Sequence, residues 1–191
     1  MTKGRLEAFS DGVIAILITI MVLELRIPHG TGWEALRPLV PKLLSYLLSF
    51  VFLGIYWNNH HHMLHMAERV NGGILWANLH LLFWLSLVPF GTAWIGENGV
   101  APLPVALYGV IFFMAGFAYF ILERAIVAHQ GPHSQLREAV GNVLKERISL
   151  FAYAGGIAGA FAWPAASMGV YVAVALMWLV PDRRIEARLS R

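Results

Sequence analysis

Long apolar runs separated by short polar segments recur along all 191 residues of the chain. A helix that crosses a bilayer needs roughly 20 mostly apolar residues. The pattern predicts six such helices, at about residues 6–25, 38–62, 73–96, 105–128, 148–163 and from 164 to just before 181. Pro89 predicts a kink within the third helix, and Pro164 opens the sixth. We therefore expect an all-α membrane protein that forms a single domain over residues 1–191.

The composition supports a membrane protein. Hydrophobic residues make up 58% of the chain and charged residues only 13%, whereas soluble domains are about half apolar and a quarter charged. The net charge of +3 comes from basic residues placed between apolar runs and at the C-terminus, without the basic stripe typical of nucleic-acid binding. Cysteine is absent, which excludes disulfides and thiolate metal sites. The expected partner is a lipid bilayer and no nucleic acid.

The placement of basic residues predicts the orientation in the membrane. Of the 14 Lys and Arg residues, only Arg26, Arg37 and Lys42 fall in segments on one side of the six predicted spans. Lys and Arg near span ends favour the cytoplasmic side. We therefore predict a multi-pass protein of the cell membrane with both termini in the cytoplasm.

The first predicted helix is unusually short for a span. Its uncharged segment, residues 12–23, covers 12 residues between Asp11 and Glu24, or about 18 Å of helix. A hydrocarbon core is about 30 Å thick. Carboxylates at the ends of an intramembrane helix usually face a bundle interior or a water path. This helix is therefore expected to lie inside an assembly, shielded by longer helices.

At 100° per residue the same helix has two distinct faces. One apolar stripe contains Phe9, Gly12, Ile16, Ile20 and Leu23, with Thr19 at its margin. Ser10 and Asp11 point the opposite way. If the stripe faces a symmetry axis, its bulky residues form stacked apolar rings, and such constrictions can gate a channel by dewetting. The spacing is also typical of ordinary helix packing, but the short span and its acidic ends favour a pore.

A histidine cluster supports a different hypothesis. His60, His61, His62 and His65 lie close in sequence, and His61 and His65 are four residues apart, so on one helix they would be able to share zinc or copper. A metal-binding membrane enzyme or a metal transporter would use His60, His61 and His65 in this way. Because the cluster lies at a membrane edge with only Glu68 as a nearby carboxylate, this remains the alternative function.

Three other features have structural interpretations. His80, in the middle of the third helix, is either a proton relay or a histidine hydrogen-bonded inside the bundle, and we favour the latter. Gly155 and Gly159 have the spacing of small residues that let helices approach closely. Residues 134–138 either begin a short surface helix or form a solvated connector, which we favour.

Several motifs resemble one known family. Arg5, Phe9, Ser10 and Asp11 match the Arg-x-x-x-Phe-Ser-Asp signature of the transmembrane protein 175 family of potassium channels. The segment from Trp57 to His60 resembles that family's Trp/His segment. Asn78-Leu and the sequence Leu-Val-Pro-Phe at 87–90 are similar to its third helix. Six spans in a chain of this length resemble the prokaryotic members, which carry one repeat.

The resemblance implies a homotetramer around a central pore lined by the first helix, with potassium as the permeating ion, no cofactor and no enzymatic activity. By offset from the signature, Ile16 forms the narrowest ring, followed by Ile20 and Leu23. Thr19 occupies the position implicated in potassium selectivity. Ala15 stands where some relatives have serine, which implies weaker selectivity. The chain lacks the Thr-Val-Gly-Tyr-Gly filter of ordinary potassium channels.

The resemblance also implies a bracing role for the signature residues. Arg5, Phe9, Ser10 and Asp11 would hold the first helix against the second and third helices, with Trp57, His60 and Asn78 as partners. A buried carboxylate is tolerated only when it is paired and hydrogen-bonded, and an indole, an imidazole and an amide supply suitable groups. Such a network would fix the rotation of the first helix and thereby the radius of the pore.

Overall fold

The structure is a computed structural model that describes residues 2–131 and 143–179. Every regular element in these two ranges is helical. The elements are α1 (Lys3–Val22), α2 (Trp33–Leu36), the 3₁₀ helix η1 (Arg37–Leu39), α3 (Val40–His65), α4 (Gly72–Ser86), α5 (Val88–Asn98), α6 (Pro102–Gln130), α8 (Val143–Gly159) and α9 (Pro164–Leu179). The predicted connector at 134–138 lies outside the described residues.

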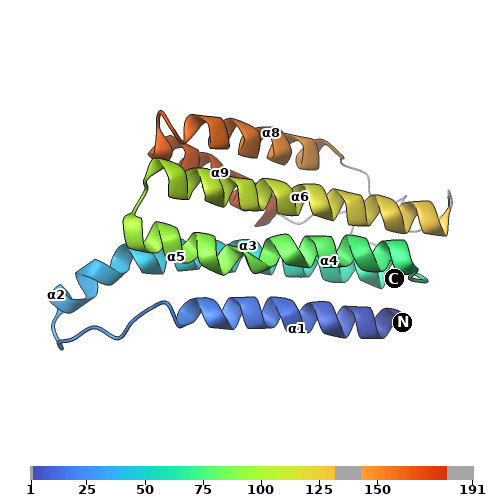
Figure 1. Cartoon of the computed structure of the whole chain (residues 1–191), viewed down its shortest axis with the longest axis horizontal. Coiled ribbons are helices and arrows are strands. Elements are labelled where there is room, and N and C mark those ends of the chain that lie inside the picture. Colours follow the sequence, from blue (N-terminus) through green and yellow to red (C-terminus); the bar gives the residue numbers. More distant parts are fainter. Residues whose placement is uncertain (1, 132–142, 180–191) are drawn as a thin grey trace.

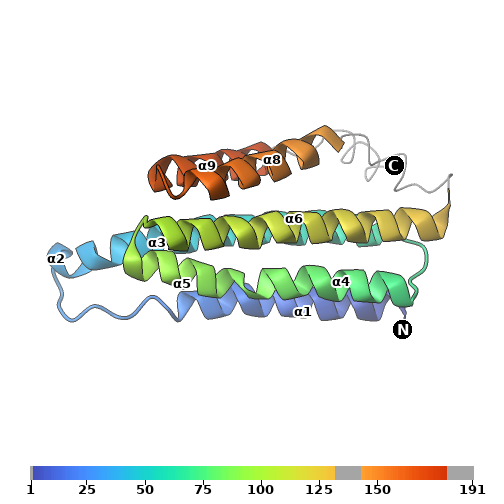
Figure 2. The ribbon, with the colours of Figure 1, turned by 45° about the horizontal axis from the view of Figure 1, so that its top comes forward.

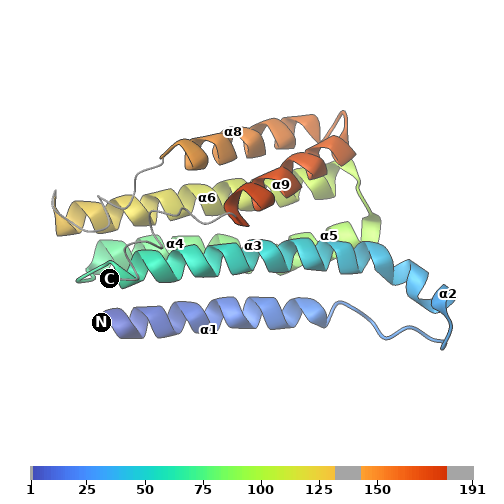
Figure 3. The same ribbon diagram turned by 180° about the vertical axis from the view of Figure 1, so that it is seen from behind.

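The long helices run alongside one another in an elongated bundle (Figure 1). The first helix, α1, lies along one edge, whereas α8 and α9 lie along the opposite edge, and the views from other directions agree (Figures 2 and 3). On its inner side α1 contacts α3, α4 and α5, and α6 contacts both α4 and α8. One side of α1 is therefore left without a neighbour from the helices in residues 2–131 and 143–179.

Among the described residues, four helical segments are long and apolar enough to cross a membrane: Lys3–Glu24, Trp33–His65, Gly72–Asn98 and Pro102–Gln130. The segment Pro164–Leu179 is apolar but has only 16 residues, and α8 has 17. The expectation of an all-helical, multi-pass membrane protein is confirmed. The count of six spans stays a prediction.

The third predicted helix is broken rather than continuous. It consists of α4 and α5, which are separated at Leu87, two residues before Pro89. Proline lacks a backbone N–H, and its ring collides with the carbonyl group four residues earlier in a helix. At the other end of α4, Asn71 caps the helix by accepting a hydrogen bond from the Ile74 N–H at 2.9 Å. The kink predicted from Pro89 therefore interrupts the helix at a single residue, Leu87, whose backbone stays in the right-handed helical region.

Other helix boundaries differ from the sequence-based ones by a few residues. The first helix was expected over residues 6–25, but α1 begins at Lys3 and ends at Val22. Leu23 is consequently the C-terminal cap of α1 and not an interior position of its apolar stripe. The second helix extends to His65 instead of ending at residue 62.

Close packing between α6, α8 and α9 depends on Gly109 and Gly156 as well as on the expected Gly159. A Cβ atom at Gly156 would lie 2.5 Å from Tyr171 Cε1, and one at Gly109 would overlap the Tyr171 hydroxyl. At Gly155 a Cβ would meet nothing within 4 Å, whereas at Gly159 it would lie 3.2 Å from Ser167 Oγ. The predicted close approach is therefore found at Gly159 but not at Gly155, because the tyrosine approaches the adjacent Gly156.

Candidate pore helix and its anchors

The two faces of α1 differ sharply in exposure. Leu6, Ser10, Ile14, Leu17 and Met21 are buried against the rest of the chain. The predicted apolar stripe is exposed instead: the exposed fraction of the side chain is 48% for Phe9, 59% for Ile16, 40% for Ile20 and 76% for Leu23. Thr19 is also exposed, and its hydroxyl donates to the Ile16 carbonyl at 2.9 Å. The apolar stripe thus points away from the helices of its own chain.

A buried chain of hydrogen bonds joins α1 to α4 and α3. Asn78 Nδ2 of α4 donates to Ser10 Oγ of α1 at 3.0 Å, and Asn78 Oδ1 lies 2.7 Å from His60 Nε2 of α3. Ser10 in turn donates to the Leu6 carbonyl at 2.9 Å. All three side chains are nearly inaccessible to solvent. Because the side chain of Asn78 hydrogen-bonds with both Ser10 and His60, this one residue of α4 links α1 to α3.

The carboxylate of Asp11 has a separate partner. Trp57 Nε1 of α3 donates to Asp11 Oδ1 at 3.0 Å, at a site where Trp57 is still 44% exposed. The structure therefore divides the expected network in two, since Asn78 hydrogen-bonds with Ser10 and with His60 but not with Asp11. Arg5 is exposed and forms no ion pair within the described residues. Phe9 lies on the exposed stripe.

Two further links hold α1 in place, and the sequence did not reveal them. Lys3 Nζ donates to the His65 carbonyl at the end of α3, at 2.7 Å. Near the other end of α1, Thr92 Oγ1 of α5 lies 3.8 Å from Met21 Sδ. The hydroxyl of Thr92 is part of a buried cluster with Ser49.

This cluster contains three hydroxyl groups. Ser49 Oγ of α3 lies 2.6 Å from Thr92 Oγ1 and 2.8 Å from the hydroxyl of Tyr108 in α6. Thr92 also donates to the Val88 carbonyl at 2.7 Å, next to the break between α4 and α5. The sequence feature that could have pointed to this cluster is the pair Ser45 and Ser49, two polar residues four apart in an otherwise apolar segment.

The histidine cluster does not form a metal site in the part of the chain that the structure describes. His60 is buried and directed at Asn78, whereas His61 and His65 are exposed and stack on each other with ring centroids 6.3 Å apart. Within residues 2–131 and 143–179, no group of three or more His, Cys, Asp or Glu side chains is placed to hold a metal ion. The metal hypothesis therefore has no support from the geometry.

Other polar residues have partners elsewhere in the bundle or on their own helix. His80 Nε2 accepts a hydrogen bond from Trp84 Nε1 at 3.0 Å, which agrees with a histidine satisfied inside the bundle. Arg37 pairs with Glu34 at 3.5 Å. Lys42 of α3 pairs with Glu97 of α5 at 2.5 Å. Glu24 is exposed at the end of α1.

An all-helical bundle whose N-terminal helix is anchored on its polar face and uncovered on its apolar face has the architecture of a membrane channel subunit. The family model described as "Endosomal/lysosomal potassium channel TMEM175" matches residues 5–89. A Chryseobacterium protein named as a potassium channel is 56% identical over 190 residues, covering 100% of this chain and 99% of its own. The chain belongs to the TMEM175 family, whose members are ion channels and not enzymes.

Two other relatives extend the comparison. A crystal structure described as a lysosomal potassium-selective channel TMEM175 homolog from Chamaesiphon minutus superimposes with a TM-score of 0.80 at 28% identity, covering 93% of this chain and 96% of that one. The Gallus gallus protein named as an endosomal/lysosomal proton channel is 28% identical over 201 residues, covering 93% of this chain but only 37% of its own. Relatives are thus named for two different permeating ions.

Proposed function

We propose that this chain is one subunit of a potassium-preferring cation channel of the cell membrane, without a Thr-Val-Gly-Tyr-Gly filter. Four copies surround a central pore lined by α1, and each copy contributes six transmembrane helices from one domain over residues 1–191. Both termini lie in the cytoplasm. The bacterial relative that matches nearly the whole chain is named for potassium, and this favours potassium over the protons named for the vertebrate relatives.

The observation that carries this proposal is the division of α1 into two faces. The polar positions that a membrane helix must bury are hydrogen-bonded within the subunit, as Ser10 is with Asn78. The apolar stripe with Ile16 is left uncovered. In the proposed assembly this stripe meets its symmetry copies, so Ile16 forms the narrowest ring and Ile20 and Leu23 form wider rings beyond it. An apolar ring narrow enough to dewet blocks ions until it widens.

The hydrogen bonds behind α1 set the width of that ring in our proposal. Ser10 and Asp11 fix the rotation of α1 through Asn78 and Trp57, and a change in rotation would move Ile16 relative to the axis. Apolar rings offer potassium no oxygen ligands, so selection requires hydroxyl groups. Thr19, exposed one residue before Ile20, is the hydroxyl that we propose for this role.

Ion flux through the purified protein in liposomes tests the proposal. We expect potassium flux well above that of protein-free liposomes, and a smaller sodium flux under the same gradient. A proton gradient, imposed in a separate set of vesicles, measures proton conduction by the same protein. Absence of potassium flux from protein that elutes as a single oligomer would refute the proposed function, and equal potassium and sodium flux would refute its selectivity.

A further inference from the structure

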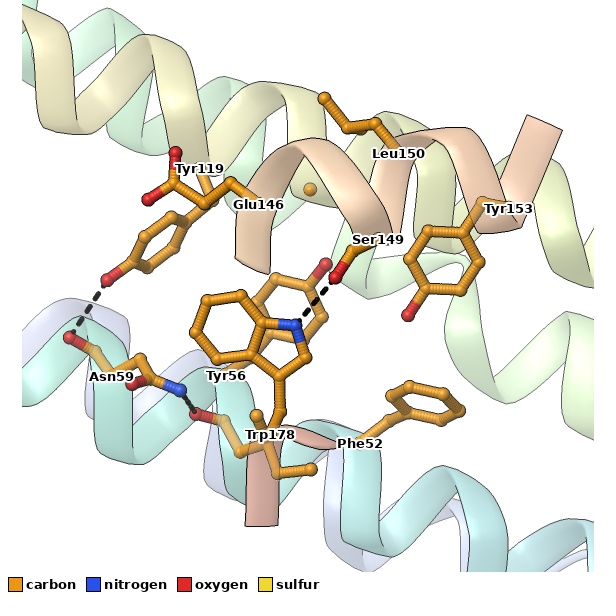
Figure 4. A pocket seen from close by; sticks show the side chains of 11 residues that line it. Phe52, Tyr56, Asn59, Tyr119, Glu146, Ser149, Leu150, Tyr153 and Trp178 are labelled. Atoms are coloured by element: carbon orange, nitrogen blue, oxygen red, sulfur yellow. Dashed lines mark hydrogen bonds between the residues drawn. The ribbon is translucent and has the colours of Figure 1, made fainter. Parts of the chain in front are cut away.

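A pocket between four helices lies apart from α1. The residues that line it belong to α3, α6, α8 and α9, and its volume is about 520 Å³ including its open side. Figure 4 shows that its two ends differ in chemistry. Asn59, Tyr119 and Glu146 lie at one end, whereas Phe52 and Tyr153 lie at the other. The pocket is thus polar at one end and aromatic at the other.

Most hydrogen-bonding groups of the pocket are already used. The Tyr119 hydroxyl donates to the Asn59 carbonyl at 3.2 Å, and Trp178 Nε1 donates to Ser149 Oγ at 2.8 Å. Glu146 is the exception, because its Oε2 atom is buried and has no hydrogen-bond partner among the described residues. A buried carboxylate oxygen without a donor is costly. The polar end of the pocket therefore has an unmet requirement for a donor.

A second carboxyl group lies next to Glu146. Glu123 of α6 is only 5% exposed, and its carboxyl group hydrogen-bonds with that of Glu146. Such a bond requires a proton on one of the two carboxyl groups, so the pair carries one negative charge when the other is ionised. Arg124 acts on both electrostatically, but it is exposed, and its guanidinium lies 4.9 Å from the centroid of the Phe120 ring. The polar end of the pocket is therefore acidic.

The rest of the pocket suits an apolar body. Phe52, Tyr56, Tyr153 and Trp178 present aromatic rings, and seven residues of α8 separate Glu146 from Tyr153, or about 10 Å. Small-molecule sites are typically mostly apolar with a few placed polar groups, and aromatic faces attract cations. We propose that this pocket binds a lipophilic cation, with a protonated amine at Glu146 and an aromatic or aliphatic body among the rings. An uncharged lipid chain would fill the apolar end but leave Glu146 Oε2 without a partner.

Binding of monodansylcadaverine, a primary amine on a fluorescent aromatic body, tests the proposal on the purified full-length protein in detergent. Energy transfer from tryptophan to the dansyl group reports occupancy. The matched probe is its N-acetylated form, which has the same body but no charge. One lost charge pair of about 1.4 kcal/mol corresponds to roughly tenfold in affinity, so we expect the acetylated probe to bind at least that much more weakly. Equal binding of the two probes would overturn the proposal and indicate partitioning of an adventitious additive only.

Two variants locate the binding site. Glu146→Gln keeps the size of the side chain and should reduce binding of the amine by roughly tenfold while leaving the acetylated probe unchanged. Gly116 lines the pocket, and a Cβ there would lie 3.6 Å from both Leu150 Cδ2 and the Tyr56 hydroxyl, so Gly116→Leu should fill the space and reduce binding of both probes. Gly155→Leu, at an open position of α8, is the control. Unchanged amine binding in Gly116→Leu would exclude this pocket.

The test does not depend on ion flux. The comparison of the two probes on the unmodified protein requires no variant, so a folding defect in Glu146→Gln leaves the proposal falsifiable. Elution of each variant as the same oligomer is checked first. Failure of the channel function would appear in liposome flux alone, whereas failure of this inference would appear in probe binding alone.

Discussion

Asn78 donates a hydrogen bond to Ser10 at 3.0 Å although 68 residues separate them in the chain. The same amide lies 2.7 Å from His60, so one side chain connects the helix that we place at the pore to the two helices behind it. Inside a membrane, polar side chains that hydrogen-bond across helices position those helices relative to one another. In our proposal Asn78 therefore limits how far α1 rotates.

Asn78→Ala should destabilise the protein, because it leaves Ser10 and the ring of His60 without their shared partner. Loss of a buried partner typically costs about 1–3 kcal/mol. Thermal unfolding of the detergent-solubilised protein measures this loss. The control is Asn98→Ala, since Asn98 is exposed and donates only to the Trp94 carbonyl of its own helix, and its effect should stay within about 0.5 kcal/mol. Equal effects of the two variants would contradict the role of Asn78.

The contact between Asp11 and Trp57 should contribute to opening and assembly more than to selectivity. Asp11→Ala and Trp57→Phe each remove this hydrogen bond, and the double variant should be less destabilised than the sum of the two single variants. We expect a coupling of about 1 kcal/mol, because water competes for the partly exposed indole. The ratio of potassium to sodium flux should not change. Additive effects, or a changed ratio, would show that Asp11 does not act as a brace.

The sequence predicted the parts of this site that depend on helical period. Ser10 and the stripe with Ile16 were assigned to opposite faces of one helix, and the structure has Ser10 buried and Ile16 exposed. The period of a helix fixes such relationships because side chains repeat every 3.6 residues. The kink at Pro89 was also predicted, because it depends on the local chemistry of proline and not on distant parts of the chain.

Partners that lie far apart in the chain were harder to assign. Asp11 was expected to share His60 and Asn78, but Asn78 hydrogen-bonds with Ser10 and with His60, whereas Asp11 accepts from Trp57. The approach of Tyr171 to Gly156 instead of Gly155 likewise depends on how α9 packs on α8. The period of one helix does not specify its rotation against another, so these pairings were not predictable.

Ile16→Asn should raise potassium flux several-fold, because a polar side chain at the narrowest ring removes the barrier made by dewetting. The matched control is Leu144→Asn on α8, since Leu144 is 61% exposed and Ile16 59%, but α8 lies on the opposite edge of the bundle. Flux in liposomes containing equal amounts of each protein provides the comparison. Unchanged flux in Ile16→Asn, or an equal rise in the control, would show that Ile16 does not form the gate.

Gly109→Ala should loosen the packing of α9 on α6, because the added methyl group would overlap the hydroxyl of Tyr171. Overpacking of this kind costs about 1–3 kcal/mol, whereas Gly155→Ala, at an open position, should have little effect. The Tyr171 hydroxyl is buried and has no partner among the described residues, so Tyr171→Phe alone should not destabilise the protein. Combined with Gly109→Ala, it should restore part of the lost stability, because the colliding oxygen is gone. Thermal unfolding of the four variants decides this, and a double variant no more stable than Gly109→Ala would show that the hydroxyl is not the obstacle.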